Sequence, residues 1–383
     1  MRLTVASSLF FLFEVILPAH AEPKLNLSAE AGPELDTNAT RLQQTVSANE
    51  APVQSGLMRF VAGGNVTLRP GLNHLLVFAY GGGAKVFLSE AARSADEVVQ
   101  QGDLSWMVKL PPGTLSLSGN YYDAIQRGSL RDFRTGGGIL QFAVDQLVRM
   151  TKAALHVGYR GLQYKPDTNY SFNGLQGGLA LGWNPTSERG DAAADWNLSL
   201  SYTISPRFYN GEVVLPSGQC GPGSLNSFCI GNSKRQDMNH LFRTEINYLG
   251  DISGSVWYAA EINRSNSYGE TFTRHVVGIK FTSHLAWDVF LTAKGAIQLS
   301  RFRDPFLTSV VSNLSLISID EENRSSLMAQ LARDLSDRWA INLRYSRYVN
   351  ESSSATETGS VTKESAEFLR HTLFLGARFE YSH

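Results

Sequence analysis

Three kinds of side chain in this 383-residue sequence could do chemistry: two cysteines, a few histidines, and basic residues recurring at alternate positions of patterned segments. Cys220 and Cys229 lie in a stretch rich in Gly, Ser and Asn. In an oxidising compartment such a pair would close a small loop and stabilise it by about 2–3 kcal/mol. We predict an intramolecular disulfide, with two free loop thiols as the alternative. Two cysteines are too few for a four-cysteine zinc site or a disulfide framework.

A hydrolase would need a nucleophile with a base on a neighbouring element. His156, His275 and His371 lie well inside patterned segments, but no His-x-Ser-x-Gly signature surrounds any of them. Metal-binding clusters are also absent from the sequence, and Asp36 with Asn38 is interpreted as a loop-entry pair. We therefore expect no enzyme, no metal site and no cofactor.

The composition indicates a membrane barrel. The net charge is −1 with a sequence pI of about 6.7, whereas nucleic-acid binders are usually basic. Charged residues make up 18% and glycine is frequent, and the mean hydropathy of −0.16 is too polar for a bundle of membrane helices. Low charge, many glycines and 10% aromatic residues are typical of an outer-membrane β-barrel.

The N-terminus predicts export. Arg2 precedes a mostly apolar run from Val5 to Leu17, and Pro18-Ala19-His20-Ala21 provides an A-x-A cleavage site. We predict a signal peptide over residues 1–21 and a single outer-membrane barrel domain over 22–383. No later run of 18 apolar residues occurs, so a membrane-embedded mature chain must be a barrel. We also expect no plug, passenger or periplasmic module before the first strand.

The hydrophobic pattern from Lys24 onward has a period of two, as in Leu373, Leu375, Ala377, Phe379 and Tyr381. It predicts an all-β, transmembrane, antiparallel up-and-down β-barrel of about 16 strands. The strands are expected at residues 24–35, 57–68, 74–87, 103–110, 114–124, 132–144, 148–162, 171–183, 195–207, 239–248, 253–265, 271–283, 286–300, 324–335, 338–349 and 366–381. An extra hairpin within Phe306–Ile319 would give 18 strands.

The links between these segments alternate in length, and the aromatic residues follow them. Tight links such as 111–113 and 335–337 alternate with long ones such as 37–56, 89–101, 208–238, 301–323 and 350–364. Short turns on one rim and long loops on the other are expected of an outer-membrane barrel, with the short side periplasmic. Five tryptophans are assigned to the short-turn rim: Trp183, Trp196, Trp257, Trp287 and Trp339. Trp106 is the exception. A soluble β-sandwich or propeller explains neither pattern.

Strand parity assigns the side chains that face the lumen. The inward-facing cations are predicted to be Arg59, Lys85, Lys109, Lys152, Arg160, Arg243, Arg274, Lys280, Lys294, Arg344, Arg370 and Arg378, and the anions Glu30, Glu245, Glu261 and Glu380. Twelve cations against four anions cannot all be paired, so the wall should attract anions. The alternative is that these charges pair with one another and with polar side chains to fill the barrel.

The segment Glu34-Leu35-Asp36-Thr37-Asn38-Ala39-Thr40-Arg41 resembles the "Asp-Ser/Thr-Asn-x-x-Arg" segment at the first strand of several outer-membrane barrel families. Some of those families occur with exopolysaccharide assembly systems. More broadly, the mature chain resembles the porin-class barrels of Gram-negative bacteria. It lacks the Pro-Glu-Phe-Gly-Gly motif of general trimeric porins, and two residues follow its last aromatic residue, Tyr381.

Two functions remain open from the sequence. A channel would pass polar, preferably anionic material, either small solutes or an exported polysaccharide. A non-conducting barrel would anchor an envelope machine for adhesion, motility or polysaccharide or coat secretion. Either would reside in the cell outer membrane and contact outer-membrane lipid and lipopolysaccharide. The barrel-assembly machinery would insert it, periplasmic components of an export or envelope complex are further candidate partners, and no nucleic acid is expected.

Overall fold

The computed structural model describes residues 23–39, 52–128, 132–145, 147, 150, 151–185, 195–220, 228–250, 252–304, 325–350, 353–355, 361–362 and 368–383. The predicted signal peptide over residues 1–21 and the Phe306–Ile319 segment lie outside these residues. No helix in the described part of the chain is long and apolar enough to cross a membrane.

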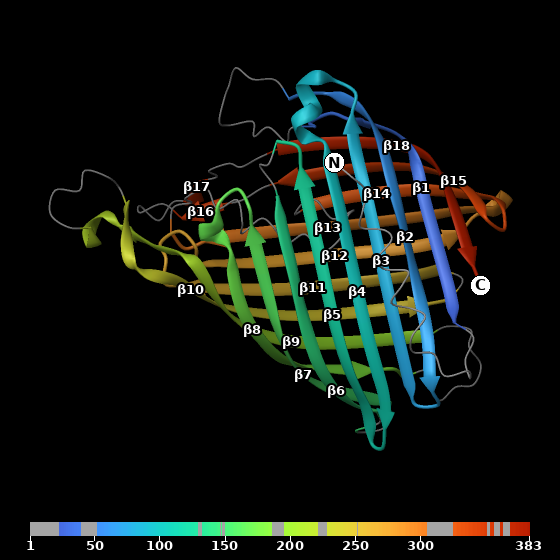
Figure 1. Cartoon of the computed structure of the whole chain (residues 1–383), viewed down its shortest axis with the longest axis horizontal. Coiled ribbons are helices and arrows are strands. Elements are labelled where there is room, and N and C mark those ends of the chain that lie inside the picture. The colour runs from blue at the N-terminus through green and yellow to red at the C-terminus, as the bar shows by residue number, and fades with distance from the viewer. Residues whose placement is uncertain are drawn as a thin grey trace.

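Sixteen strands form one closed antiparallel barrel, as predicted (Figure 1). They are β1 (Lys24–Asp36), β2 (Ser55–Gly71), β3 (His74–Phe87), β4 (Glu97–Leu110), β5 (Gly113–Gln126), β6 (Phe133–Asp145), β7 (Thr151–Tyr164), β8 (Phe172–Trp183), β9 (Asp195–Pro216), β10 (Phe228–Leu249), β11 (Ile252–Ser265), β12 (Phe272–His284), β13 (Val289–Phe302), β14 (Ser325–Ser336), β15 (Trp339–Asn350) and β18 (Phe368–Ser382). Each pairs with its neighbour along the chain, and β15 pairs with β18. The first strand closes the barrel by pairing with the last, with Ala29 opposite Phe379.

Two short strands, β16 (Ser353–Ala355) and β17 (Val361–Thr362), lie in the link between β15 and β18. β16 pairs with β17 and with the end of β13. Because β15 pairs directly with β18, neither short strand enters the barrel wall. The wall therefore has 16 strands.

The outer face carries the apolar half of the alternating pattern. On β12, β13 and β18 the exposed side chains include Val277, Ile279, Ile297, Leu299 and Leu375, and the residues between them point inward. Closure of the barrel leaves no unpaired strand edge, and the exposed apolar side chains around it suit a hydrocarbon solvent. The chain is an outer-membrane β-barrel.

Most links on one rim are shorter than those on the other, although the link over residues 184–194 between β8 and β9 is a long one on the short-turn rim. One rim has tight turns, such as the links between β2 and β3, β4 and β5, and β10 and β11. The other rim carries the long links and the 3₁₀ helices η1 (Glu90–Ala95), η2 (Thr168–Tyr170) and η3 (Ser217–Gln219), whereas η4 (Ala286–Asp288) makes a tight turn. By the rule that short turns are periplasmic, the long-link rim faces outward from the cell.

The link predicted at residues 208–238 is instead mostly strand. β9 and β10 are 22 residues each and continue their pairing as far as Phe228 and Pro216. They extend past their neighbours at the left of Figure 1. Gly, Ser and Asn in this region indicate a loop by sequence, but two long strands can pair through a polar segment that faces water on both sides. β4 likewise begins at Glu97, earlier than the predicted residue 103.

Two tryptophans differ from the predicted aromatic rim. Trp106 lies four residues before the end of β4 at the short-turn rim, on the outer face, and stacks on His74 with ring centroids 6.0 Å apart. Trp257 has the inward parity of β11 and lies over Gly278. It is therefore a lumen residue and does not belong to an aromatic belt.

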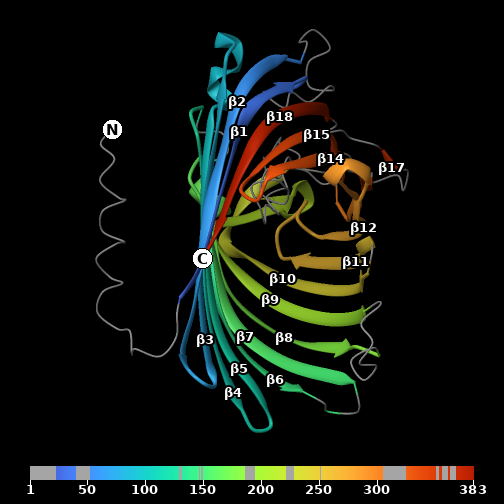
Figure 2. The same cartoon turned by 90° about the vertical axis from the view of Figure 1, so that its right-hand side faces the viewer.

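The wall folds into two faces that oppose each other across the barrel interior. Figure 2 shows β2–β7 as one face and β8–β15 as the other, curved face. Near the long-link rim the inner surface of β4–β9 holds a buried aromatic cluster that includes Tyr122, Phe133, Tyr164, Phe172 and Tyr209. A second small core packs Leu57 and Phe87 against η1.

Candidate functional site

The predicted lumen residues alternate with the side chains of the outer face, as Lys280 does beside the exposed Ile279 and Arg344 beside the exposed Leu343. Registers place several of them opposite one another: Arg59 faces Lys85, Glu261 faces Arg274, and Lys280 faces Lys294. These positions make a polar inner wall. Whether this wall lines a conducting path remains a prediction.

The inner charges are far better balanced than the predicted twelve cations against four anions. Seven of those cations have a carboxylate partner, in the pairs Arg59–Glu34, Lys152–Asp145, Arg243–Glu245, Arg274–Glu261, Arg344–Glu30, Arg370–Asp36 and Arg378–Glu380. The missed acids have simple causes. Glu34 and Asp36 share the parity of Glu30 at the very end of β1, and Asp237 lies where a loop was expected. Arg207, also inward, was missed as the last residue of a predicted strand.

One inner cluster joins the last strands to the first. Glu30 accepts hydrogen bonds from Arg344 Nη2 at 3.0 Å and Asn342 Nδ2 at 2.7 Å. The buried Phe374 ring has Arg344 4.8 Å and Arg59 6.0 Å from its centroid. Phe374 lies flat over Gly376, where a Cβ atom would come within 2.2 Å of its ring. Cation–π contacts and ion pairs therefore hold this part of the wall in one arrangement.

The Asp-Thr-Asn segment that carries the family resemblance also lies at the closure seam, where β1 pairs with β18. The Asp36 carboxylate accepts hydrogen bonds from Arg370 Nε at 2.9 and 3.0 Å and from the backbone of Asn38 at 2.9 Å. Thr37 exchanges hydrogen bonds with the backbone of His371. The segment thus fastens the end of β1 to β18, and its described residues have a structural role. Arg41 lies outside the described residues.

A second inner cluster lies on β7–β12 and carries excess positive charge. Glu261 accepts hydrogen bonds from Asn239 at 2.7 Å and Arg274 at 2.8 Å, with Arg207 at 3.8 Å. Arg160 lies close enough to Arg207 and Glu261 to interact electrostatically with both. Its side chain makes no hydrogen bond or ion pair with the described residues. Three arginines therefore share one carboxylate.

Above this cluster, towards the long-link rim, the charged side chains form a buried network of ion pairs. Arg235 binds Asp237 at 2.7 Å and Glu270 at 2.9 Å and lies 4.0 Å from the Tyr209 ring centroid. Asn263 donates to Asp237 and to the backbone of Glu270, both at 2.9 Å. Arg235, Asp237 and Asn263 are all buried. This network closes off side chains that would otherwise be available to a solute.

Nearer the periplasmic rim the inner wall is more exposed. Lys280 faces Lys294 directly across the β12–β13 ladder, Lys109 and Lys280 are exposed, and neither of these two lysines has an ion-pair partner among the described residues. Trp257 lies on the neighbouring strand over Gly278. Together with Arg160, Lys109 and Lys280 are the sites on the described inner wall where an incoming anion could find uncompensated charge.

The histidines and cysteines have ordinary structural surroundings. His156 faces inward with Nε2 3.4 Å from Thr203 Oγ1, and His275 and His371 face outward, each 2.8 Å from a tyrosine hydroxyl. Cys220 and Cys229 are joined by a disulfide with their Cα atoms 5.8 Å apart, at the tip of the β9–β10 hairpin. No group of three or more His, Cys, Asp or Glu within the described residues could hold a metal ion.

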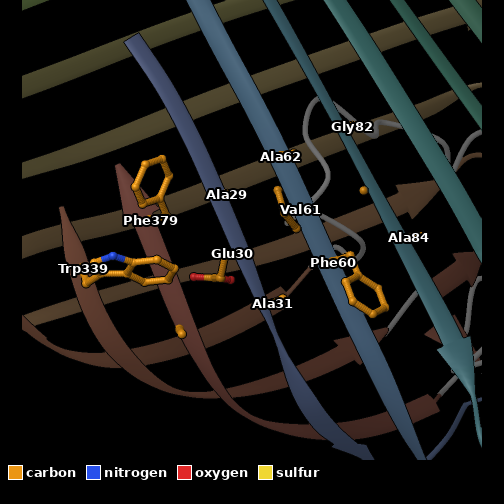
Figure 3. A pocket seen from close by; sticks show the side chains of 12 residues that line it. Ala29, Glu30, Ala31, Phe60, Val61, Ala62, Gly82, Ala84, Trp339 and Phe379 are labelled. Carbon is orange, nitrogen blue, oxygen red and sulfur yellow. The ribbon is translucent and has the colours of Figure 1, made fainter. Parts of the chain in front are cut away.

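An apolar groove of about 460 Å³ lies on the outer face of the closure seam (Figure 3). Phe60 borders it on one side and Trp339 and Phe379 on the other, with small side chains such as Ala29 and Ala62 along its floor. The Glu30 carboxylate is bound by Arg344 on the inner side of the wall. The groove therefore opens towards lipid and is separate from the inner charges.

Comparisons with known proteins give no relative by sequence: no protein-family model and no curated protein matches the chain. Among solved structures it is similar to OccAB3 of Acinetobacter baumannii, with 9% identity over 94% of this chain and 100% of that one and a TM-score of 0.42. It is also similar to the outer membrane protein opdK from Pseudomonas aeruginosa, with 10% identity, coverage of 94% and 99% and a TM-score of 0.41. A bacterial polysaccharide outer membrane secretin gives 8%, coverage of 95% and 100%, and 0.39. Values this low describe general architecture and nothing beyond it.

Proposed function

We propose that this barrel is an outer-membrane channel that passes polar solutes and prefers anions. The observation that carries the proposal is that Lys109 and Lys280 are exposed on the inner wall and have no ion-pair partner among the described residues. Arg160 adds a third site of excess charge farther along the lumen. Basic side chains on a low-dielectric wall raise the local concentration of anions and repel cations.

Charge reversal at the two lysines tests this preference. In planar bilayers with a salt gradient, the reversal potential of Lys109→Glu/Lys280→Glu should move towards potassium, because basic charge on the inner wall changes sign. Arg333→Glu is the matched control, since Arg333 is an exposed arginine on the outer parity of β14. The control should leave the reversal potential unchanged. Identical potentials for the lysine variant and the wild type would refute the proposal.

Arg344 is unsuitable for this test even though its position in the wall is similar. Its guanidinium is held by Glu30 at 3.0 Å, so Arg344→Glu would place two carboxylates together in a partly buried site. A change in selectivity in that variant could not be separated from local unfolding. Lys280 carries no such partner within the described chain.

The size of the cargo is a separate part of the proposal. We propose small anionic solutes; an exported polysaccharide is the larger cargo that the same charge would attract. The burial of Arg235, Asn263 and Phe374 on the inner face favours the smaller class. Swelling of protein-loaded liposomes in uronic acid oligomers of increasing length should stop after short oligomers, and rapid entry of long oligomers would favour polysaccharide passage.

A non-conducting anchor is the second candidate. The same buried inner side chains favour it, because a tightly packed interior near one rim leaves little room for a solute. A folded barrel that gives no current in bilayers would select this function over the channel.

A further inference from the structure

Three arginines lie at the long-link end of the outer face of β11–β13. Arg264 is on β11, Arg301 is on β13, and Arg303 follows β13 directly. All three are exposed, and none of their side chains makes a hydrogen bond or ion pair within the described residues. Asp304, the neighbouring acid, accepts a hydrogen bond from the Gly269 backbone at 3.4 Å. Counted over the described residues, the patch therefore has a net positive charge.

The strand registers bring Arg264 and Arg301 to one site. Arg301 is opposite Thr273 of β12, and Thr273 is opposite Ile262, two residues below Arg264. Neighbouring strands lie about 4.8 Å apart, so the two arginine backbones are about 10–12 Å apart. Two flexible arginine side chains can meet over the Thr273 hydroxyl across that span.

The height of this site matches the headgroup region of the outer leaflet. Arg264 comes 12 residues after Ile252, and Arg301 comes 12 residues after Val289, the residues that begin their strands at the short-turn rim. At about 3.3 Å per residue and a strand tilt of about 40°, each arginine stands about 30 Å above that rim. The apolar band of such barrels is about 25 Å tall, so both arginines project just above it.

The residues beneath the arginines are suited to lipid. Tyr258 Oη lies 2.8 Å from His275 Nδ1, and Tyr202 Oη lies 2.8 Å from His240 Nδ1 on the neighbouring strands. Each pair satisfies polar groups that hydrocarbon would leave unpaired. Arg264 and Arg301 lie above this level on the outer face of β11–β13.

We propose that Arg264 and Arg301 bind a phosphate of the lipopolysaccharide headgroup on the outer face of β11–β13, with Arg303 beside them. Guanidinium groups match the geometry of phosphate oxygens and form charge-assisted hydrogen bonds. The outer leaflet of the outer membrane presents phosphorylated glucosamine at this height. The proposal does not depend on conduction through the lumen.

Binding of purified lipid A to the full-length, delipidated protein in detergent tests the proposal. Arg264→Ala/Arg301→Ala should bind bis-phosphorylated lipid A about tenfold or more weakly, because two charge-assisted contacts are lost. Arg333→Ala, which removes an exposed outward arginine near the opposite rim, should bind like the wild type. Dephosphorylated lipid A should bind the wild type as weakly as the double variant binds the phosphorylated form.

Two results would overturn the proposal. One is equal lipid A affinity in the double variant and the wild type. The other is displacement of lipid A by inorganic phosphate or phosphatidylglycerol at equal concentration, which would indicate a general anion patch. Arg264→Lys/Arg301→Lys keeps the charge but loses the bidentate geometry, so it should bind with intermediate affinity. That variant keeps the test valid if the alanine variant fails to fold.

Discussion

Asp36 and Arg370 are buried at the seam where the last strand meets the first. Their side chains are 0% and 1% exposed, and Asp36 also accepts a hydrogen bond from the backbone of Asn38. Removing one partner of such a pair leaves a buried charge without compensation. The short segment that resembles other barrel families is thus explained by barrel closure.

Asp36→Ala should therefore lower the free energy of unfolding by about 3–5 kcal/mol. Urea unfolding of protein folded in liposomes would measure the loss. The control is Arg378→Ala, whose partners Asp334 and Glu380 are about half exposed, and it should cost no more than about 1 kcal/mol. Equal costs for the two variants would contradict the seam's importance.

Trp257 is a second test at residue scale. A Cβ atom at Gly278 would lie 1.9 Å from the Trp257 ring, so Gly278→Ala must displace the ring and should cost about 1–3 kcal/mol. Gly182→Ala is the matched control, because its nearest inward neighbour, Lys152, is 3.8 Å away. Tryptophan fluorescence and urea unfolding would report both effects. An unchanged spectrum in Gly278→Ala would contradict the lumen position of Trp257.

The sequence could not place Trp257 correctly for a physical reason. Large aromatic side chains usually mark the interface on an outer-membrane barrel, and parity alone distinguishes the two faces. The absence of a side chain at Gly278 on the next strand creates the space for an inward ring, and a register between strands is needed to see it.

At the scale of elements, the β9–β10 hairpin joins two long strands through a disulfide near its tip. Cys220→Ser/Cys229→Ser should leave barrel unfolding unchanged within about 0.5 kcal/mol, because the closed strand ladder supplies that stability. Limited proteolysis should cut the variant within residues 217–229 and spare the wild type. Non-reducing mass spectrometry of protein extracted without reductant should find the bond, and free thiols would refute it.

The strand pattern was predictable and the strand ends were not. Alternation over segments of about ten residues predicted all sixteen wall strands, because a period of two follows directly from one face in lipid and one inside. The pattern fades once both faces of a hairpin meet water, so the extension of β9 and β10 carried no signal. Arg235 and Asp237 could therefore not be predicted as inner residues, and neither could the network that they form near the long-link rim.

At the scale of the whole molecule, the rim with long links should face the outside of the cell. A tag inserted at Gly223 or Ser354 should be reached by antibody on intact cells. A tag at Pro112, in the tight turn between β4 and β5, should be reached only after the outer membrane is opened. Labelling of the Pro112 tag on intact cells would reverse the topology.

The predicted excess of positive charge on the inner wall is much smaller in the structure than the sequence indicates. Parity correctly groups Arg59, Arg344 and Arg370 on one side of the wall, but each is neutralised by a carboxylate at 3.5 Å or less. Ion pairs depend on side-chain reach across strands, which an alternating pattern does not specify. The excess that remains rests on few residues, chiefly Arg160, Lys109 and Lys280.

The central claim, a channel that prefers anions, is tested most directly by the reversal potential of the purified wild-type barrel in a planar bilayer across a potassium chloride gradient. We expect a measurable current and a potential whose sign shows chloride to be more permeant than potassium. The preference should shrink in concentrated salt, where the Debye length falls to about 3 Å at 1 M. A potential favouring potassium, or no current from a folded barrel, would contradict the claim.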